Sequence, residues 1–283
     1  MGEIELWHLK EIPRVAYFYW GNDSLSFLRY LTIFSFKKQN PDWEIKLYRP
    51  KIKFQGRKTW KTMECYAHFI GKNYIDRLLN MDIDVVEVDF CNLGFNNNVP
   101  ETFKADFLRW ILLSTQGGLW SDFDIIYFKP MKSLYFNNDT NKQINTVVCH
   151  NIYHRIGFLL SSPQNDFYKF VAQQAKRKFN PTEYQSIGSW ILNINFPGIG
   201  IIENLFPHLN IFNLETDVVY PLNENTIPTI FKVNCSIIKE KSIGIHWYGG
   251  HPESEKWENC LTENNFRNYD NFLCQIINKA MAG

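Results

Sequence analysis

The chain has 283 residues, of which 45% are hydrophobic and 16% aromatic, so it can bury a sizeable core and is expected to form one domain over residues 1–283. Thirty basic and 29 acidic side chains give a formal net charge of +1, which excludes an overall field that would recruit nucleic acid or an anionic membrane. Six scattered cysteines without Cys-x-x-Cys or zinc-type spacing predict free thiols in a reducing compartment.

The first third of the chain alternates predicted strands with a predicted helix. A β-branched and aromatic run at 12–22, closed by Gly-Asn, predicts a buried strand, and 24–38 has the apolar spacing of an amphipathic helix after a serine cap. Residues 43–48 and 83–89 predict two further strands. Strand, helix and strand in succession favour a right-handed parallel crossover, so we expect an α/β fold.

A helix is predicted from Pro100-Glu101 to the pair Gly117-Gly118. Five of its residues recur at intervals of one helical turn and are expected to form the packed face: Ala105, Leu108, Ile111, Leu112 and Thr115. Asp106 and Arg109 are three residues apart, so their side chains are expected to project together. The two glycines suit the left-handed conformation that ends a helix and reverses the chain.

Asp122 and Asp124 follow these glycines and are expected at the end of a buried strand, on the same side of it. Two carboxylates held so close in apolar surroundings repel each other, and a divalent cation makes the arrangement favourable. An isolated Asp-x-Asp is also typical of a solvated turn between two strands, so the motif alone leaves both interpretations open.

The order of residues over this stretch resembles the sugar-binding region of retaining GT-A glycosyltransferases. The resemblance is carried by Ala105, Asp106, Arg109, Gly117, Gly118, Asp122 and Asp124. The families concerned are the yeast-type initiating mannosyltransferases, the capsular polysaccharide transferases and the glucosylating toxins. The resemblance implies a GT-A (Rossmann-like) fold with a mixed, mainly parallel sheet flanked by helices. It also implies a nucleotide-binding part over about 12–130 and an acceptor-side part over about 131–283.

The predicted first strand ends at Trp20, where a parallel sheet places its ligands. Related transferases begin with Ile-Pro and a tryptophan that packs on the nucleotide base, and Ile12-Pro13 and Trp20 match that pattern. The resemblance therefore assigns Trp20 to the nucleotide, with Phe18 and Tyr19 beside it. A tryptophan of the core is the alternative.

Residues 243–257 combine a short apolar strand with an aromatic, glycine-rich loop. His246, Gly249 and Trp257 resemble the C-terminal motif with which many of these enzymes close their site. The resemblance implies that His246 binds the metal and that Gly249 and Trp257 lie at the diphosphate, with His251 as a second candidate ligand. A core histidine beside a surface loop is the alternative.

The remaining predicted elements are strands at 146–150 and 156–162, a helix at 165–177, a short helix beginning near Gly188, and a terminal helix at 263–281. Family members place acceptor-facing residues around such strands, which makes His150, Asn151 and His154 candidates. A structural role is the alternative for both histidines.

Together these features predict a metal-dependent glycosyltransferase, a hexosyl- or pentosyltransferase that uses Mn²⁺ or Mg²⁺. The donor would be a nucleotide sugar, a UDP-sugar first and a GDP-sugar second, and the acceptor a hydroxyl of a glycan or glycoconjugate. The resemblance implies retention of configuration. Asp122, Asp124 and His246 would hold the metal, Asp122 and Arg109 would also contact the donor, and Asp106 and Arg109 would grip the sugar.

Two other functions remain open. An aspartate-nucleophile phosphohydrolase also uses Asp-x-Asp, although Ile126 stands where such enzymes have Thr or Val. A noncatalytic carbohydrate-binding or structural protein would suit the nine tryptophans and many asparagines. No segment approaches the about 18 apolar residues of a membrane span, and the charged N-terminus predicts no signal peptide. We expect no nucleic-acid partner and a cytoplasmic location, including the host cytosol for a chain of viral or effector origin.

Overall fold

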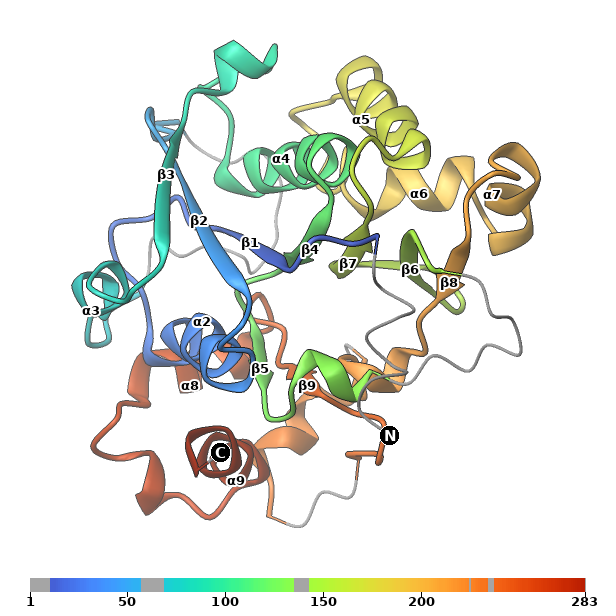
Figure 1. Cartoon of the computed structure of the whole chain (residues 1–283). Helices are drawn as coiled ribbons and strands as arrows, with labels where there is room; N and C mark the ends of the chain where they lie inside the picture. Colours follow the sequence, from blue (N-terminus) through green and yellow to red (C-terminus); the bar gives the residue numbers. More distant parts are fainter. Residues whose placement is uncertain (1–10, 57–68, 135–142, 224, 234–236, 283) are drawn as a thin grey trace.

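A seven-stranded sheet runs through the computed structural model, which describes residues 11–56, 69–134, 143–223, 225–233 and 237–282 (Figure 1). The strand order is β3-β2-β1-β4-β7-β6-β8. β1 pairs in parallel with β2 and β4, β2 with β3, and β6 with β8, whereas β7 is antiparallel to both β4 and β6. The predicted fold class, an α/β protein with a mixed, mainly parallel sheet flanked by helices, is confirmed.

The N-terminal half of the sheet follows the predicted order of elements. β1 (Val15–Tyr19) leads through α2 (Phe27–Gln39) to β2 (Glu44–Pro50), and α3 (Ile75–Leu79) precedes β3 (Asp84–Val88). Ser26, rather than the first serine of the predicted helix, caps α2 by accepting a hydrogen bond from the Arg29 backbone N–H.

The strand order reverses between β1 and β4, because the chain adds β2 and β3 on one side of β1 and then crosses to the other side. The crossing uses η2 (Phe90–Leu93), α4 (Glu101–Thr115) and β4 (Gly118–Ser121). Gly117 and Gly118 have φ angles of 68° and 101°, so both adopt left-handed or related backbone conformations as predicted. Crevices at such reversals, past the carboxyl ends of strands, are where open α/β sheets bind ligands.

A second, two-stranded sheet joins β5 (Ile125–Tyr127) to β9 (Gly244–His246) in antiparallel register. The prediction of one buried strand around the Asp-x-Asp is therefore wrong. The chain leaves the large sheet after Ser121, turns through Asp122, Phe123 and Asp124, and enters the small sheet at Ile125. The alternative of a turn between two strands is the better description, although Asp124 is buried rather than solvated.

The second half of the chain supplies the other edge of the large sheet and the remaining helices. Its elements are η3 (Met131–Ser133), β6 (Thr146–His150), β7 (His154–Ser161), α5 (Asp166–Lys178), α6 (Ser189–Asn195), α7 (Ile199–Leu205), β8 (Ile211–Asn213), η4 (Thr216–Val218), η5 (Ile227–Phe231), α8 (Pro252–Cys260), η6 (Phe266–Asn268) and α9 (Phe272–Ala282). The predicted strands at 146–150 and 156–162 and the helix at 165–177 are confirmed.

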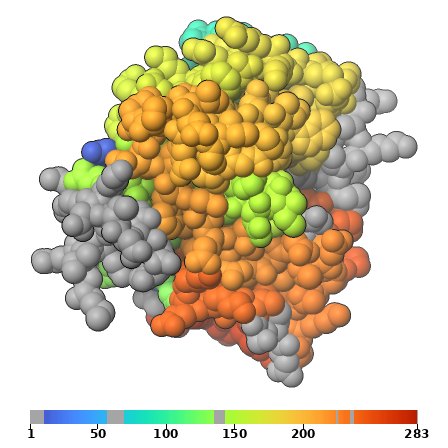
Figure 2. All heavy atoms as spheres, turned by 90° about the vertical axis from the view of Figure 1, so that its right-hand side faces the viewer, coloured from blue at the N-terminus to red at the C-terminus, as the bar shows by residue number. Residues whose placement is uncertain are grey.

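Two apolar cores lie on the two faces of the large sheet. One joins α4, α5, α6 and α7, and the other joins α2, α9 and the small sheet. Figure 2 shows a side of the molecule on which α5, α6 and α7 (yellow to orange) lie above the orange-to-red C-terminal segment. None of the helices in the described part of the chain combines the length and apolar character that a membrane span requires.

The packed face of α4 differs from the prediction. Phe103, Phe107 and Trp110 are almost completely buried, whereas Ala105 and Ile111 are half-buried and Thr115 is exposed. The reason is that α4 lies between the sheet and α5, so most of its circumference is covered and the apolar spacing does not single out one face. Among the described cysteines, Cys91, Cys149, Cys260 and Cys274 are free as predicted, and Cys65 and Cys235 lie outside the described residues.

Candidate active site

A cavity of about 770 Å³ opens past the carboxyl ends of β1 and β4, at the point where the strand order reverses. Its lining comes from the β1 end, the start of α4, the Asp-x-Asp turn and the loop and helix after β9. Seven of the predicted site residues line it: Tyr19, Trp20, Asp106, Arg109, Asp122, Asp124 and Gly249. The elements therefore bring together most of the residues that the sequence singled out.

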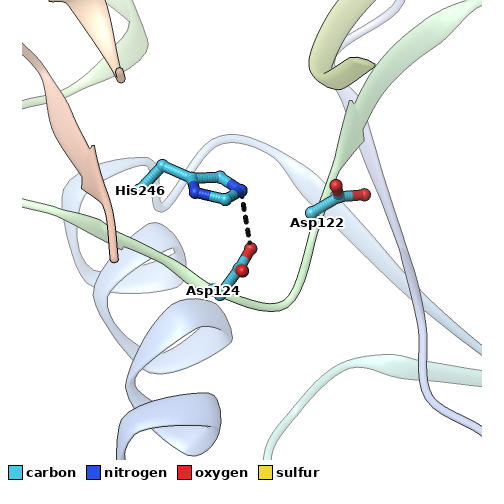
Figure 3. Close-up of side chains that lie close together, drawn as sticks. All are labelled: Asp122, Asp124 and His246. Atoms are coloured by element: carbon cyan, nitrogen blue, oxygen red, sulfur yellow. Dashed lines mark ion pairs between the residues drawn. The ribbon is translucent and has the colours of Figure 1, made fainter. Parts of the chain in front are cut away.

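Asp122, Asp124 and His246 form a compact cluster (Figure 3), in which Asp122 and Asp124 line the cavity, whereas His246 is not among the described residues that line it. One ligand atom from each residue lies within 4.8 Å of the others. Asp122 and Asp124 come from the turn between β4 and β5, and His246 comes from β9, which pairs with β5. In the pairing of β5 with β9, Ile125 lies opposite His246. This pairing brings His246 next to Asp124 although the two residues are 122 positions apart in the chain.

Asp124 is 8% exposed and has three favourable partners. Its Oδ1 lies 3.0 Å from Nε2 of His246, its Oδ2 accepts a 2.9 Å hydrogen bond from the Gly249 backbone N–H, and the Arg29 cation lies nearby. Burial by itself raises the pKa of this carboxyl, but His246, Arg29 and the Gly249 N–H together hold the pKa well below its usual range. Asp124 is therefore a buried anion.

Asp122 has a different environment, with a side chain that is 30% exposed. Its Oδ1 accepts hydrogen bonds of 2.8 Å from Nη2 of Arg109 and of 2.8 Å from Nε1 of Trp120. Its backbone N–H donates to the Gly157 carbonyl on β7 at 2.8 Å. A Cβ on Gly157 would lie 2.6 Å from Oδ2 of Asp122, so the close approach requires glycine there.

Arg109 links two carboxylates, Asp106, which the sequence paired with it, and Asp122. Its Nη1 donates to Asp106 at 2.7 Å while Nη2 donates to Asp122, and its side chain is 3% exposed. Burial lowers the pKa of this guanidinium, but Asp122 and Asp106 outweigh burial and raise it. The predicted pairing of Asp106 with Arg109 is confirmed, and the cluster of one cation with two carboxylates keeps a net negative charge.

Gly188, at the start of α6, lies against the Asp106 carboxylate. A Cβ at this position would be 2.7 Å from Oδ2 of Asp106 and 2.1 Å from Oε1 of Gln185. Gln185 itself lines the cavity with a φ of 67°, a conformation that a residue other than glycine seldom adopts. Strained backbone of this kind concentrates at functional sites, so Gln185 joins the candidate residues.

Trp20 follows β1 at the cavity wall with 7% of its surface exposed. Its ring lies 5.3 Å from that of Phe123, and its Nε1 donates to the Ser24 carbonyl at 3.0 Å. Tyr19 also lines the cavity, and its hydroxyl donates to Glu101. Phe18 is fully buried against Phe36 and Phe123, because alternate strand residues point to opposite faces, and it has no exposed surface to offer a nucleotide.

The loop after β9 brings Gly249 to the cavity but takes Trp257 elsewhere. Trp257 lies in α8 and stacks on Phe231 at 5.3 Å, and it is not among the described residues that line the cavity. His251 caps α8, where its Nδ1 accepts a 3.1 Å hydrogen bond from the Glu253 backbone N–H. His251 is therefore outside the cluster of Asp122, Asp124 and His246.

The acceptor-side candidates lie at the β6–β7 turn. The rings of His150 and His154 are 4.4 Å apart, and Asn151 is exposed between them. His154 is 1% exposed and its Nε2 lies 2.7 Å from the Phe196 carbonyl oxygen. Burial lowers the pKa of His154 to about 4; the Phe196 carbonyl opposes this shift and His150 adds to it. None of the three is among the described residues that line the cavity.

Sequence reasoning missed a second group of charged residues at the cavity. Arg29 on α2 donates from Nε to Oε1 of Glu258 on α8 at 2.9 Å, and its guanidinium lies over the rings of Trp20 and Trp247 at 5.3 and 4.9 Å. Glu101, at the start of α4, accepts hydrogen bonds from the Phe54 backbone N–H at 2.9 Å and from Lys104 at 3.0 Å. Except for Lys104, which lies three residues after Glu101, these partners are distant in sequence, so no local motif reveals the contacts at the cavity.

The cluster fits a divalent cation by its donor set rather than by repulsion. Each carboxylate already has a cationic or imidazole partner, so repulsion between Asp122 and Asp124 does not by itself require a metal. However, two carboxylates and an imidazole converge, and the buried Nδ1 of His246 has no hydrogen-bond partner in the part of the chain that the structure describes. Carboxylate oxygens and imidazole nitrogens are ordinary metal ligands.

No protein-family model and no curated protein matches the chain. Among solved structures, the galactosyltransferase LgtC in complex with donor and acceptor sugar analogues is similar at 12% identity, over 95% of each chain, with a TM-score of 0.46. The glycosyltransferase PaToxG is similar at 15% identity, over 72% of this chain and 79% of that one, with a TM-score of 0.44.

The bifunctional glycosyltransferase WbbM is similar at 10% identity, over 95% of this chain and 52% of that one, with a TM-score of 0.46. Likenesses this distant do not assign an activity to the chain.

Proposed function

We propose that the protein is a metal-dependent glycosyltransferase. It would transfer a hexosyl or pentosyl group from a nucleotide sugar, a UDP-sugar first and a GDP-sugar second, to a hydroxyl of a glycan or glycoconjugate. Retention of configuration follows from the sequence resemblance. The observation that carries the proposal is the cluster of Asp122, Asp124 and His246, whose two carboxylates line the cavity, with the Asp106 and Arg109 pair and Trp20 on the same cavity.

The residues of the cavity would bind different parts of the donor, according to their chemistry. Trp20 offers an aromatic edge at the β1 end, where a base can stack. Asp106, already fixed by Arg109, can accept hydrogen bonds from sugar hydroxyls, and the planar guanidinium holds both carboxylates at fixed spacing. Such fixed geometry is how an enzyme orients a donor for transfer.

Asp122, Asp124 and His246 would hold the cation. When bound, a divalent cation neutralises charge that develops on the departing nucleoside diphosphate. The imidazole makes the donor set softer than Mg²⁺ prefers, which favours Mn²⁺ of the two candidate ions. Asp124 is the carboxylate that is fully buried and ionised, so we assign it the more direct contact.

The two alternative functions fit the contacts less well. The phosphohydrolase motif follows the first strand and has Thr or Val two residues beyond it, whereas here the motif lies between β4 and β5 and Ile126 fills that place. A protein that only binds carbohydrate does not need buried carboxylates, whose burial is costly unless they are paired or bind a metal. Neither alternative accounts for the convergence of three ligand atoms within 4.8 Å.

The test is hydrolysis of a panel of UDP- and GDP-sugars by the purified chain in the absence of acceptor, with Mn²⁺, with Mg²⁺ and with EDTA. Release of nucleoside diphosphate from one donor, abolished by EDTA and restored by Mn²⁺, is the expected result. A thermal-shift series with the same donors identifies the nucleotide, because a ligand that binds the folded state raises stability with its concentration over Kd. Phosphate release from simple phosphate esters instead of sugar release would support the phosphohydrolase.

A further inference from the structure

Residues 246–249, which are the end of β9 and the first part of the loop after it, contact Asp124 at three of their four positions. His246 faces Oδ1 at 3.0 Å, the Trp247 backbone N–H donates to the Asp124 carbonyl at 2.9 Å, and the Gly249 backbone N–H donates to Oδ2 at 2.9 Å. The orientation of the Asp124 carboxylate therefore depends on the path of this loop.

Among these four residues, Tyr248 makes none of these contacts with Asp124, and its backbone conformation is unusual. Its φ is 52°, in the left-handed region that residues other than glycine seldom occupy. This turn of the chain lets the N–H groups of Trp247 and Gly249 both reach Asp124. A strained residue persists only where its surroundings hold it in place.

The Tyr248 side chain is held by hydrogen bonds on the acceptor side of the protein. Its hydroxyl accepts a 2.6 Å hydrogen bond from Nη1 of Arg155 and donates to the Leu222 carbonyl at 3.0 Å. Its ring stands edge-on to that of His246, with centroids 4.2 Å apart. The Arg155 guanidinium is fixed in turn over the ring of Tyr220, at 5.3 Å.

Arg155 belongs to β7, the strand that also positions Asp122. Gly157 is two residues further along β7, and its carbonyl accepts the 2.8 Å hydrogen bond from the Asp122 backbone N–H. One strand thus reaches both carboxylates, Asp122 directly through Gly157 and Asp124 indirectly through Arg155, Tyr248 and the loop after β9.

We propose that Arg155 and Tyr248 are positioning residues of the metal site, which set the distance between the two carboxylates from β7. The inference rests on the proposed function, because it assumes that Asp122, Asp124 and His246 bind a cation. Neither residue needs to touch the cation or the donor. Partners that orient metal ligands in this way typically contribute about 10- to 100-fold to metal affinity.

The test is the dissociation constant for Mn²⁺ alone, measured by electron paramagnetic resonance on the full chain without nucleotide. Tyr248→Phe removes the hydroxyl and keeps the ring on His246. We expect it to raise Kd by about 10-fold or more. Tyr168→Phe is the control, because it removes a buried hydroxyl on α5, which donates to the Val147 carbonyl at 3.0 Å rather than taking part in the connection from Arg155 to the loop after β9.

The control should lower thermal stability to a similar extent and leave Kd for Mn²⁺ unchanged. Unfolding of each variant in EDTA, followed by circular dichroism, shows that the variants fold. Arg155→Met and the double variant complete a mutant cycle, in which the double variant should lose no more affinity than the larger single loss because both changes break one connection.

The possible results separate the two proposals. A wild-type chain without measurable Mn²⁺ affinity would refute the proposed metal site itself. A wild-type chain that binds Mn²⁺ with Tyr248→Phe of equal affinity would refute the positioning role alone. Equal losses in Tyr248→Phe and Tyr168→Phe, or additive losses in the cycle, would also refute it, because they indicate general destabilisation or independent effects.

Discussion

Two arginines line the cavity, and each lies near one carboxylate of the Asp-x-Asp turn. Arg109 comes from α4, is buried, and is hydrogen-bonded to two carboxylates, Asp106 and Asp122. Arg29 comes from α2, has a side chain that is 14% exposed, and forms a salt bridge to Glu258, while the faces of two tryptophan rings cover it. Arg109 is therefore hydrogen-bonded to a carboxylate of the turn, whereas Arg29 pairs with Glu258 and contributes its charge near Asp124.

Glu258 and Asp124, the two carboxylates near Arg29, respond to burial differently. Burial raises the pKa of Glu258 even though Arg29 and Ser26 oppose the shift, whereas the partners of Asp124 outweigh burial and lower its pKa. An ionised Glu258 thus gains less from its surroundings than an ionised Asp124 does. We infer that Asp124, like the carboxylates bonded to Arg109, is arranged for chemistry on a ligand, whereas the pair of Arg29 and Glu258 holds the shape of the cavity wall.

The largest effect is expected from Asp124→Asn, which keeps the shape of the side chain and removes its charge. Turnover should fall by about 1,000-fold or more, since each ~1.4 kcal/mol lost from stabilisation of the transition state is tenfold in rate. The measurement is donor hydrolysis at saturating Mn²⁺. Wild-type turnover with unchanged cation dependence would place the metal site elsewhere.

The same variant also has a predicted effect on stability. The pKa of Asp124 is lower in the folded chain than its ordinary value of 3.8, so its charge stabilises the fold at pH above that value, and this contribution is lost as pH falls through the folded pKa. Asp124→Asn should therefore lower the free energy of unfolding at pH 7 in EDTA. Urea denaturation measures it, and a gain in stability would show that repulsion from Asp122 dominates.

The next effect separates the two arginines directly. Arg109→Lys keeps the charge but loses the planar fork that binds Asp106 and Asp122, so turnover should fall by about 100-fold while nucleoside diphosphate affinity changes little. Arg29→Lys should show the reverse, with a loss of stability and of nucleotide affinity because the rings of Trp20 and Trp247 lose their cover. Steady-state kinetics and calorimetry with UDP and GDP distinguish the two patterns, and identical patterns would remove the distinction between the regions.

A smaller effect is expected at Trp20, the ring beside Arg29 that the resemblance assigns to the nucleotide base. Trp20→Ala should weaken nucleotide binding by roughly 1–3 kcal/mol if the ring stacks on a base. Because Trp20 is also packed on Phe123, the variant should lose stability as well. Trp257→Ala is the control, since Trp257 stacks on Phe231 outside the cavity lining and should lose stability without loss of nucleotide affinity. Equal losses of nucleotide affinity in the two variants would indicate that Trp257 contacts the donor after all.

The smallest effect on turnover is expected at His154, which lies outside both regions and whose predicted effect is on stability. Its pKa is about 4 in the folded chain against an ordinary value of 6.5, so the unfolded chain binds more protons between these values. Stability should be complete above pH 6.5 and decline as pH falls from 6.5 toward 4. His154→Gln should flatten that part of the curve of stability against pH, measured by urea denaturation. An unchanged slope would show that His154 is accessible to protons in the folded chain.

The two arginines also show what the sequence can predict about this site. Arg109 is recognisable because its partners are local, with Asp106 one helical turn away and Asp122 just past the glycine pair. Arg29 reaches Glu258 across 229 positions, and Glu101 accepts a backbone N–H of Phe54, so neither contact leaves a spacing in the sequence. The same limit explains Trp257, whose partner Phe231 is set by the packing of α8.

The errors in secondary structure have a related cause. The apolar run from Leu119 to Phe128 is interrupted by Ser121, Asp122 and Asp124, and an Asp-x-Asp suits both the end of a strand and a turn, so the sequence does not show that the chain changes sheets there. That change depends on β9, which comes more than a hundred residues later to pair with β5. Likewise, the cover that α5 provides for α4 hides its expected apolar face. The alternation of strands and helices, which is local, was predicted correctly.

The change of sheet at the Asp-x-Asp turn has a thermodynamic consequence. One carboxylate belongs to the end of the large sheet and the other to the start of the small one, so a cation held between them also joins the two sheets. Coupling between two equilibria is reciprocal, so whatever the cation adds to the docking of the small sheet, that docking adds to cation affinity. Core residues of the small sheet outside the cavity lining, such as Ile245 in the core that also contains Leu273, therefore contribute to the cation affinity of the site. Binding of the cation should slow amide hydrogen exchange in β5 and β9 more than in β1 and β2.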